Sequence, residues 1–390
     1  MYDWIIDSHS NTGSIITANR HLARLLRKEF ADKKKLNKHN AWRTPIIFSW
    51  QDWLLFLKSR AFDQINLPIY INLPLLIIYL MIVVFMLGDS NPNIFLSFLF
   101  INFNIDLIHA SSAIYTLDAI FLVALSGLFI GIMGSVPGHE LSHRTKEKFD
   151  MFMANWLLSI SWDCAFAIEH VYGHHKNVGL SIDPATAKRG ENIYKFILKA
   201  IVQEQRDAWS IENDRMRRKN IGLISLKNRM ITGYFRSVVV SILSFLIGGF
   251  SGMMIFLLCA FIAKALLEVI NYTEHYGLIR VRGEKVAPRH SWNSNSIMSS
   301  IYLYNVTRHS SHHEKANLKY WELKAYDGAP MMPHGYLTML YLAIFAPFYF
   351  HSIMAKKLID WDENYASNQE RALARESNMN SGISLLLNQT

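Results

Sequence analysis

The chain has 390 residues, of which 51% are hydrophobic and only 18% are charged, and its net charge is +9. Soluble chains usually contain about 25% charged residues, so this composition excludes global disorder and favours a membrane protein. The two cysteines are too few for a disulfide scaffold, a four-cysteine zinc site or a built-in iron–sulfur centre, which takes about four thiolates. The sixteen histidines are the unusual number.

Residues 1–60 are polar and basic, and we expect them to form a cytoplasmic arm. They do not have the pattern of a signal peptide, because no apolar stretch follows a short basic start. Within the arm, residues 46–57 are too short to cross a bilayer and contain Asp52. This pattern predicts a helix that lies in the membrane interface.

Apolar stretches later in the chain are long enough to cross a hydrocarbon core about 30 Å thick, or to form a tight hairpin within it. We predict spans at 67–87, 112–134, 238–252 and 253–270. The last two are halves of one apolar run that we expect to split near Gly248, Gly249 and Gly252. The stretch between the second and third spans is rich in Lys and Arg, so the positive-inside rule places it on the cytoplasmic side with residues 1–60.

Two further apolar segments are harder to interpret. Residues 149–168 contain Asp150 and Asp163, and we expect a helix that dips into the interface and returns to the same side. Residues 336–350 have Pro347 near their end, and their pattern leaves a membrane crossing open. The class predicted from these patterns is all-α, a polytopic membrane protein with about four to six transmembrane helices.

Nine of the sixteen histidines fall into four short groups near the ends of the predicted spans. They are His139 and His143, then His170, His174 and His175, then His275, and finally His309, His312 and His313. Residues three or four apart on a helix lie on one face. We therefore expect one metal each to be chelated by the pairs His139/His143, His170/His174 and His309/His312. Just ahead of the first group, Gly131, Gly134 and Gly138 favour close helix packing over room for a linear ligand.

Nine imidazoles are too many for one metal ion and fit two. A metal-bound histidine usually donates its other ring N–H to a carboxylate or a carbonyl group. The candidates for this supporting role are Glu140, Glu169, Glu274, Asn271, Asp183 and His290. Because the histidine groups lie at the cytoplasmic ends of the spans, the sequence predicts a cytoplasmic, histidine-rich site for two metals.

Other interpretations explain less of the pattern. The segment from His139 to His143 matches the H-E-x-x-H motif of zinc proteases, but that reading uses only two of the nine histidines. A transporter would place its ligands near the middle of the membrane rather than at one side. A single histidine pair arises often by chance, whereas four groups at span ends do not.

Several longer motifs resemble one known family. They are residues 271–278 (NYTEHYGL), 183–186 (DPAT), 189–191 (RGE), 290–295 (HSWNSN), 308–310 (RHS) and 333–336 (PHGY). Together they resemble the integral-membrane non-haem di-iron hydroxylases, in the alkane 1-monooxygenase and xylene monooxygenase branch of the membrane fatty-acid desaturase-like superfamily. Ser311 stands where the alkane enzymes typically have Asp, and the family usually has six spans where four are predicted here.

The resemblance implies a desaturase-like catalytic domain over 61–355, followed by a polar tail over 356–390 that is loose from residue 363. It implies two iron ions held by the nine histidines, and the O₂-dependent conversion of a terminal C–H bond of an alkane or alkyl group to a primary alcohol. Desaturation or hydroxylation of a fatty acid or lipid is the alternative within the same superfamily.

The resemblance also implies partners. Electrons would come from a rubredoxin or a ferredoxin-type protein with its NAD(P)H reductase, and an acidic donor can dock on the basic stretch 176–236. The apolar substrate would enter from the bilayer and meet O₂ at the site. Membrane lipid is an expected partner and nucleic acid is not, and the expected location is the inner membrane of the cell.

Overall fold

A computed structural model describes residues 66–89, 97 and 100–389 of the chain. The expected arm over 1–60, its interfacial helix at 46–57 and the domain boundary at 60/61 lie outside these residues. Helices dominate the described part, which contains no strand but only a single isolated bridge between Asn293 and Met331. The prediction of an all-α fold is confirmed.

The elements of the described residues follow one another along the chain in a fixed order. They are α3 Leu67–Leu87, α5 Leu107–Ser112, α6 Thr116–Phe129, the π-helix η3 Ile130–Ser135, α7 Val136–Ser142, α8 Lys148–Ile160, α9 Phe166–Glu169, the π-helix η4 His170–His174, α10 His175–Asn177, α11 Ile193–Arg218, α12 Arg229–His275, the 3₁₀ turn η5 Pro288–His290, α13 Ile297–Tyr302, α14 His309–Glu314, α15 Tyr336–Phe345, α16 Pro347–Asn364, α17 Asn368–Met379 and α18 Ser384–Leu387.

Among the described residues, three helical stretches are long and apolar enough to cross a membrane. They are Leu67–Leu87, Thr116–Ser142 and Arg229–His275. The second begins four residues later than predicted, because the carboxylate of Asp118 accepts the backbone N–H of Tyr115 (3.0 Å) and starts the helix there. These helices are those of a membrane protein, while the number and direction of the crossings stay predictions.

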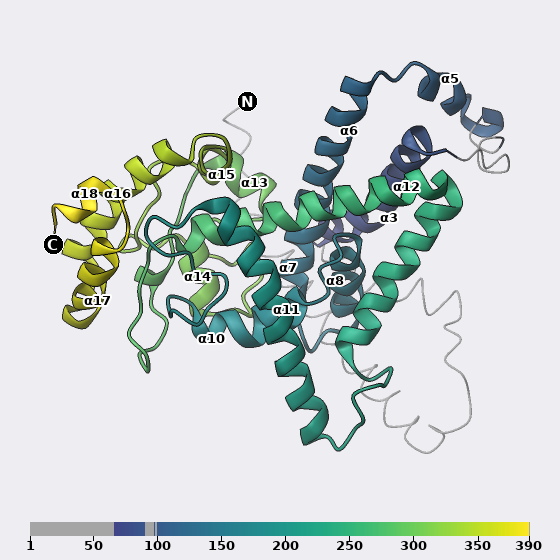
Figure 1. The fold of residues 1–390 in the computed structure, drawn as a ribbon. Helices are drawn as coiled ribbons and strands as arrows, with labels where there is room; N and C mark the ends of the chain where they lie inside the picture. Colours follow the sequence, from purple (N-terminus) through teal and green to yellow (C-terminus); the bar gives the residue numbers. More distant parts are fainter. Residues whose placement is uncertain (1–65, 90–96, 98–99, 390) are drawn as a thin grey trace, which may run out of the picture. The chain divides into compact units, whose positions relative to one another are not determined.

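The third stretch, α12, consists of two arms that meet at a sharp bend, and α3 ends beside this bend (Figure 1). The bend is at Gly249, with φ 66° and ψ −162°, a conformation that is essentially restricted to glycine. The backbone N–H of Asp89 donates to the carbonyl of Gly248 (2.9 Å), and the hydroxyl of Ser251 donates to the Asp89 carboxylate (3.2 Å). The run therefore turns at Gly249, one of the three glycines near which it was predicted to split and three residues before the predicted boundary at 252/253.

Close packing holds the first histidine-bearing helix in place. A Cβ on Gly138 of α7 would lie 2.8 Å from Leu158 of α8, and one on Gly134 would lie 3.2 Å from Leu76 of α3. Gly131 differs, because the nearest atom to a Cβ there is in Leu266, 3.9 Å away. The glycines at 134 and 138 thus serve helix packing, as expected, and Gly131 leaves room.

Two apolar segments that were predicted as single stretches are each divided between two helices in the structure. Instead of one dipping helix over 149–168, α8 stops at Ile160, the chain turns through Trp162 in a left-handed conformation (φ 55°), and α9 starts at Phe166. Instead of one run over 336–350, α15 stops at Phe345 and Pro347 begins the 18-residue helix α16. Proline fits there because the first helical position needs no N–H donor.

The prediction of a loose polar tail from residue 363 is wrong, since α17 and α18 pack against the rest of the domain. Leu386 is fully buried, and buried Glu370 pairs with Arg289 (2.8 Å) and with His290 (2.7 Å). Burial alone would raise the pKa of Glu370, but the hydrogen bonds from His290 and Arg289 lower that pKa to about 2. The polar composition hid this packing, because the ionic partners lie about 80 residues away in the sequence.

Replacing Gly249 by alanine should destabilise the bend by at least about 1–3 kcal/mol, because a side chain strains this backbone conformation. The added Cβ would also lie 1.7 Å from Asp89 Oδ1. Thermal unfolding of the purified protein in detergent should show a lower Tm. Gly222→Ala is the matched control, since a Cβ there meets no atom within 4 Å. An equal Tm for the two variants would contradict the account of the bend.

Candidate metal centre

Four chain segments bring all nine predicted histidines together. They are α7, the joined turns η4 and α10, the end of α12, and α14. Eight of the nine form two groups whose ring nitrogens lie within 4.8 Å of one another: His139, His143, His170 and His312, and then His174, His275, His309 and His313. The structure therefore brings together the histidines that were grouped from the sequence.

The pairing within the centre differs from the prediction. His139 and His143 share a group as expected, but His170 and His174 fall in different groups, and so do His309 and His312. The segment His170–His174 is a π turn rather than an α turn, and its two rings lie face to face 5.1 Å apart. The η4 segment consequently gives one histidine to each group, whereas α14 gives His312 to the first group and His309 and His313 to the second.

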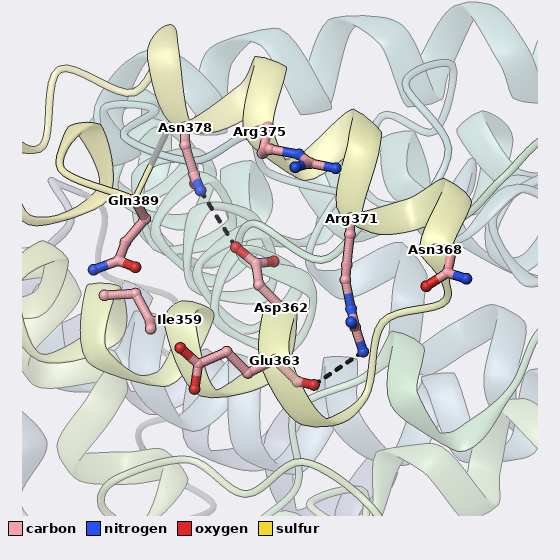
Figure 2. Close-up of a pocket in the computed structure, with 8 residues that line it drawn as sticks. All are labelled: Ile359, Asp362, Glu363, Asn368, Arg371, Arg375, Asn378 and Gln389. Carbon is pink, nitrogen blue, oxygen red and sulfur yellow. Dashed lines mark hydrogen bonds between the residues drawn. The ribbon is translucent and has the colours of Figure 1, made fainter.

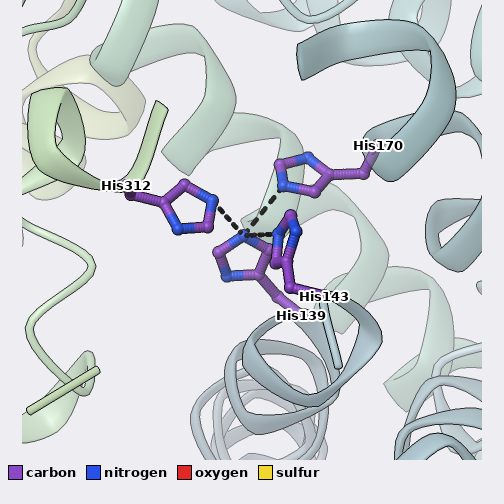
Figure 3. A group of neighbouring side chains, drawn as sticks. All are labelled: His139, His143, His170 and His312. Atoms are coloured by element: carbon purple, nitrogen blue, oxygen red, sulfur yellow. Dashed lines mark hydrogen bonds between the residues drawn. The ribbon is translucent and has the colours of Figure 1, made fainter. Parts of the chain in front are cut away.

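In the first group the Nε2 atoms converge (Figure 3). His139 Nε2 lies 2.8 Å from His170 Nε2, 3.1 Å from His312 Nε2 and 3.3 Å from His143 Nε2. His175 Nε2 lies 3.1 Å from the Nε2 atoms of both His170 and His312. The ninth histidine thus extends the first group.

The second group is built in the same way. His309 Nε2 lies 3.1 Å from His275 Nε2 and 2.9 Å from His313 Nε2. The ring of His174 packs 4.8 Å from that of His275, and its Nε2 atom is buried without a hydrogen-bond partner. Glu274 Oε2 faces the same His309 Nε2 atom at 3.2 Å.

This arrangement fits metal ions. Four nitrogens bound tetrahedrally at about 2.0–2.1 Å from a metal lie about 3.3 Å apart, close to the separations found here. Burial, together with the neighbouring histidines, lowers the pKa of His143, His170 and His312 well below the usual value. These rings are therefore neutral and offer lone pairs. The buried His174 Nε2 would be costly without a ligand.

Three of the histidine rings are oriented by hydrogen bonds that their Nδ1 atoms donate, so that Nε2 points into the centre. His174 Nδ1 donates to Asp183 Oδ2 (2.9 Å), which also accepts the hydroxyl of Thr186 (2.5 Å). His275 Nδ1 donates to the carbonyl of His290 (3.1 Å), and His309 Nδ1 to that of Val306 (3.3 Å). Such bonds fix the tautomer that leaves Nε2 free for a metal.

Apart from Asp183, the polar residues predicted to support the histidines make other side-chain contacts. Glu140 accepts from Arg144 (2.6 Å) and from the backbone N–H of Tyr320 (3.1 Å) rather than from a histidine. Glu169 Oε1 is buried without a hydrogen-bond partner, and Asn271 bonds Glu268 (3.1 Å). Glu274 faces Nε2 of His309, the ring atom that points into the second group. The ring of His290 pairs with Glu370, and only the backbone carbonyl of His290 accepts from His275. Of the six candidates, Asp183 holds a ring nitrogen through its side chain.

A narrow cavity reaches the centre from the apolar side. Its lining consists of Val136, His139, Phe166, His170, Leu267, Ile270, Asn271, Glu274 and Val306. The ring of Phe166 stacks on that of His170, with centroids 4.5 Å apart and planes 14° from parallel. The cavity, about 10 Å³ in volume, therefore lies against two rings of the first histidine group, and its other walls are mainly apolar.

A second cavity of about 390 Å³ lies among the C-terminal helices (Figure 2). It is lined by Ile359, Asp362, Glu363, Asn368, Arg371, Arg375, Asn378 and Gln389. Asp362 and Asn378 both hold the guanidinium group of Arg189, at 2.7 and 2.6 Å. Its lining includes no histidine, and these two polar groups fasten α16 and α17 to the domain.

Asp183→Asn should weaken metal binding about 10- to 100-fold, because an amide cannot hold His174 in the tautomer that leaves Nε2 free. The measurement is metal retention by the purified protein during titration with a competing chelator. Asp360→Asn on α16 is the control, since Asp360 accepts from Asn364 on the surface. Equal retention in the two variants would show that Asp183 has no influence on the centre.

Comparisons with known proteins agree with this geometry. Residues 118–343 match the model of the fatty acid desaturase family. Alkane 1-monooxygenase 2 of Alcanivorax borkumensis is 38% identical over 222 residues, which cover 56% of this chain and 58% of that protein. Alkane 1-monooxygenase of Pseudomonas putida is 37% identical over 250 residues, covering 62% and 61%. The xylene/toluene monooxygenase hydroxylase component of Pseudomonas putida is 32% identical over 244 residues, covering 63% and 66%.

The chain thus spans about three fifths of the length of the curated relatives that it matches most strongly. The stretch matched by the family model contains all nine histidines and every residue that lines the cavity beside them. The match covers more than half of the chain, and the resemblance seen in its motifs is confirmed. The chain belongs to the fatty acid desaturase family.

Proposed function

We propose that this protein is a membrane oxidoreductase that hydroxylates an apolar hydrocarbon, using O₂ to convert a terminal C–H bond of an alkane or alkyl group to a primary alcohol. The observation that carries the proposal is the burial of two histidine groups next to a small cavity whose mainly apolar lining includes His139 and His170 of the first group. The names of the relatives, alkane 1-monooxygenase and xylene/toluene monooxygenase, support this reaction.

Iron is the proposed metal in both groups. Imidazole suits iron, copper and zinc alike, so the ligands alone do not select among them. The oxygenase names of the relatives support a redox-active metal. The first iron would be held by His139, His143, His170, His175 and His312, and the second by His174, His275, His309 and His313. When bound, the pair of irons would activate O₂.

The residues around the irons would position the substrate and exclude water. An apolar substrate could approach the centre beside α12, where Val136, Leu267 and Ile270 line the cavity. Because these three side chains offer no hydrogen bonds, the hydrophobic effect would be the main force holding the substrate there, against the first histidine group.

Electrons would have to come from another protein. Both cysteines of the chain are free and buried, and two thiolates are too few for an iron–sulfur centre. The proposed donor is a rubredoxin or a ferredoxin-type protein with its NAD(P)H reductase. Within the basic stretch 176–236, Arg215 is engaged with Glu212 (2.5 Å), while Arg217 and Arg218 are exposed. The exposed pair is the better candidate for docking an acidic donor on the cytoplasmic side.

The family match also supports a second reaction. A fatty acid desaturase uses the same kind of fold, so the chain can be a desaturase or lipid hydroxylase of this superfamily. The product distinguishes the two, because hydroxylation gives an alcohol and desaturation gives a new double bond.

The test is whole-cell turnover of the full chain, expressed with a rubredoxin and its reductase and supplied with alkanes, alkylbenzenes and fatty acids. We expect a terminal alcohol, identified by mass spectrometry. His312→Ala should abolish it, because this substitution removes a nitrogen that lies about 3 Å from both His139 and His175.

The matched control is His334→Ala, which removes an exposed histidine that belongs to neither group. This variant should keep the activity of the unchanged chain. An unsaturated product would move the protein to the desaturase reaction. Iron-replete chain that forms neither product with any of these substrates would refute the proposal.

A further inference from the structure

A buried ionic cluster lies beside the metal centre and takes no part in holding the metals. Lys264 Nζ of α12 lies 2.9 Å from Asp163 Oδ1, 2.7 Å from Glu204 Oε2 and 2.9 Å from Glu268 Oε1. Each of the four side chains belongs to a residue that is at most 5% exposed. We call Asp163, Glu204, Lys264 and Glu268 the acidic cluster.

The acidic cluster is joined to the cavity through one side chain. Asn271 Nδ2 lies 3.1 Å from Glu268 Oε2 and 3.5 Å from Glu204 Oε1. Asn271 also lines the cavity, together with His139 and His170. The amide of Asn271 therefore has the acidic cluster on one side and the proposed reaction space on the other.

The charges of the cluster do not balance. Three carboxylates face one ammonium group, and Glu169 adds a further buried carboxylate nearby, with one oxygen that has no hydrogen-bond partner. Keeping uncompensated charge away from water is unfavourable, and such a site relieves the cost by binding a proton. Burial, followed by the charge of Glu268, raises the pKa of Glu204 well above its usual value.

Glu204 also lies within one helical turn of an acid that is partly exposed to solvent. It lies on α11, and Asp207, three residues further along, is on the same face and partly exposed. The Asp207 carboxylate accepts from Gln203 (2.9 Å). A proton from the cytoplasm can thus be taken up near Asp207, and Glu204 stands between that entry and the cavity wall at Asn271.

We propose that the acidic cluster stores a proton on Glu204 and releases it into the cavity at Asn271 during turnover. The inference rests on the proposed function, in which hydrocarbon, O₂, two electrons from the reduced donor protein and two protons give an alcohol and water. The oxygen atom that leaves as water takes up both protons. Glu204 supplies one of them by way of a water molecule at Asn271, and regains a proton from the cytoplasm through the Asp207 side.

A purely structural cluster would not need this composition. One carboxylate is enough to compensate the ammonium group of Lys264, and buried ion pairs add little stability over apolar packing. Ionisable residues within membrane helices commonly mark proton or substrate pathways. The excess of acids, their burial and their contact with a cavity-lining amide all match a proton store.

The test compares Glu204→Gln with Glu212→Gln in the full chain with bound iron, rubredoxin and reductase. Glu212 is a buried acid on the same helix, but it pairs with Arg215 and Arg229 and lies outside the acidic cluster. The readouts are iron per chain, alcohol formed per NAD(P)H oxidised, the pH profile of kcat and the solvent deuterium isotope effect. Asp207→Asn is the third variant.

We expect Glu204→Gln to keep its iron, to lower kcat at least about tenfold, and to raise both the isotope effect and the share of NAD(P)H oxidised without product. Asp207→Asn should lower kcat mainly at high pH, where protons are scarce, and Glu212→Gln should stay within about twofold. Unchanged kcat in Glu204→Gln, or a loss of kcat with an unmoved pH profile and isotope effect, would overturn the proton store. The absence of alcohol from the unchanged chain would instead overturn the proposed function on which it rests.

Discussion

The concentration of nine histidine rings in a dry interior is the constraint on which the rest of the structure depends. Six of these rings have a pKa well below the usual value because of burial and of one another. Neutral rings with converging Nε2 atoms repel through their lone pairs unless cations lie between them. The backbone that imposes this arrangement is held by the close packing at Gly134 and Gly138, by the bend of α12 and by the docked C-terminal helices.

The residues of the centre could be predicted from the sequence, because ligand spacing is a local property. Pairs three or four residues apart on a helix reveal themselves without any knowledge of the fold. Which histidine joins which metal could not be predicted, since the π turn at His170–His174 and the position of α14 depend on tertiary packing. The carbonyls of His290 and Val306, which orient two of the rings, have no sequence signal because every residue carries a carbonyl group.

Charge patterns were reliable in some places and misleading in others. Long uncharged runs correctly marked the apolar helices, and the glycines at 248–249 correctly marked the bend of α12. The polar composition after residue 363 suggested a loose tail, whereas Glu370 there binds Arg289 and His290. The acidic cluster around Lys264 was also missed, because its members come from α11, α12 and the turn between α8 and α9. Composition alone therefore does not reveal polar residues whose charges are compensated by partners far away in the sequence.

The division of single turns between the two histidine groups has a thermodynamic consequence. His170 and His174 are four residues apart, as are His309 and His313, with His312 between them, yet these segments contribute to both histidine groups. If each group holds a metal ion, binding of the first ion would order the backbone that presents ligands to the second, so the entropic cost of ordering would fall on the first event. The two sites would then have a favourable coupling free energy, which linkage makes reciprocal. Such a centre would fill and empty as a unit.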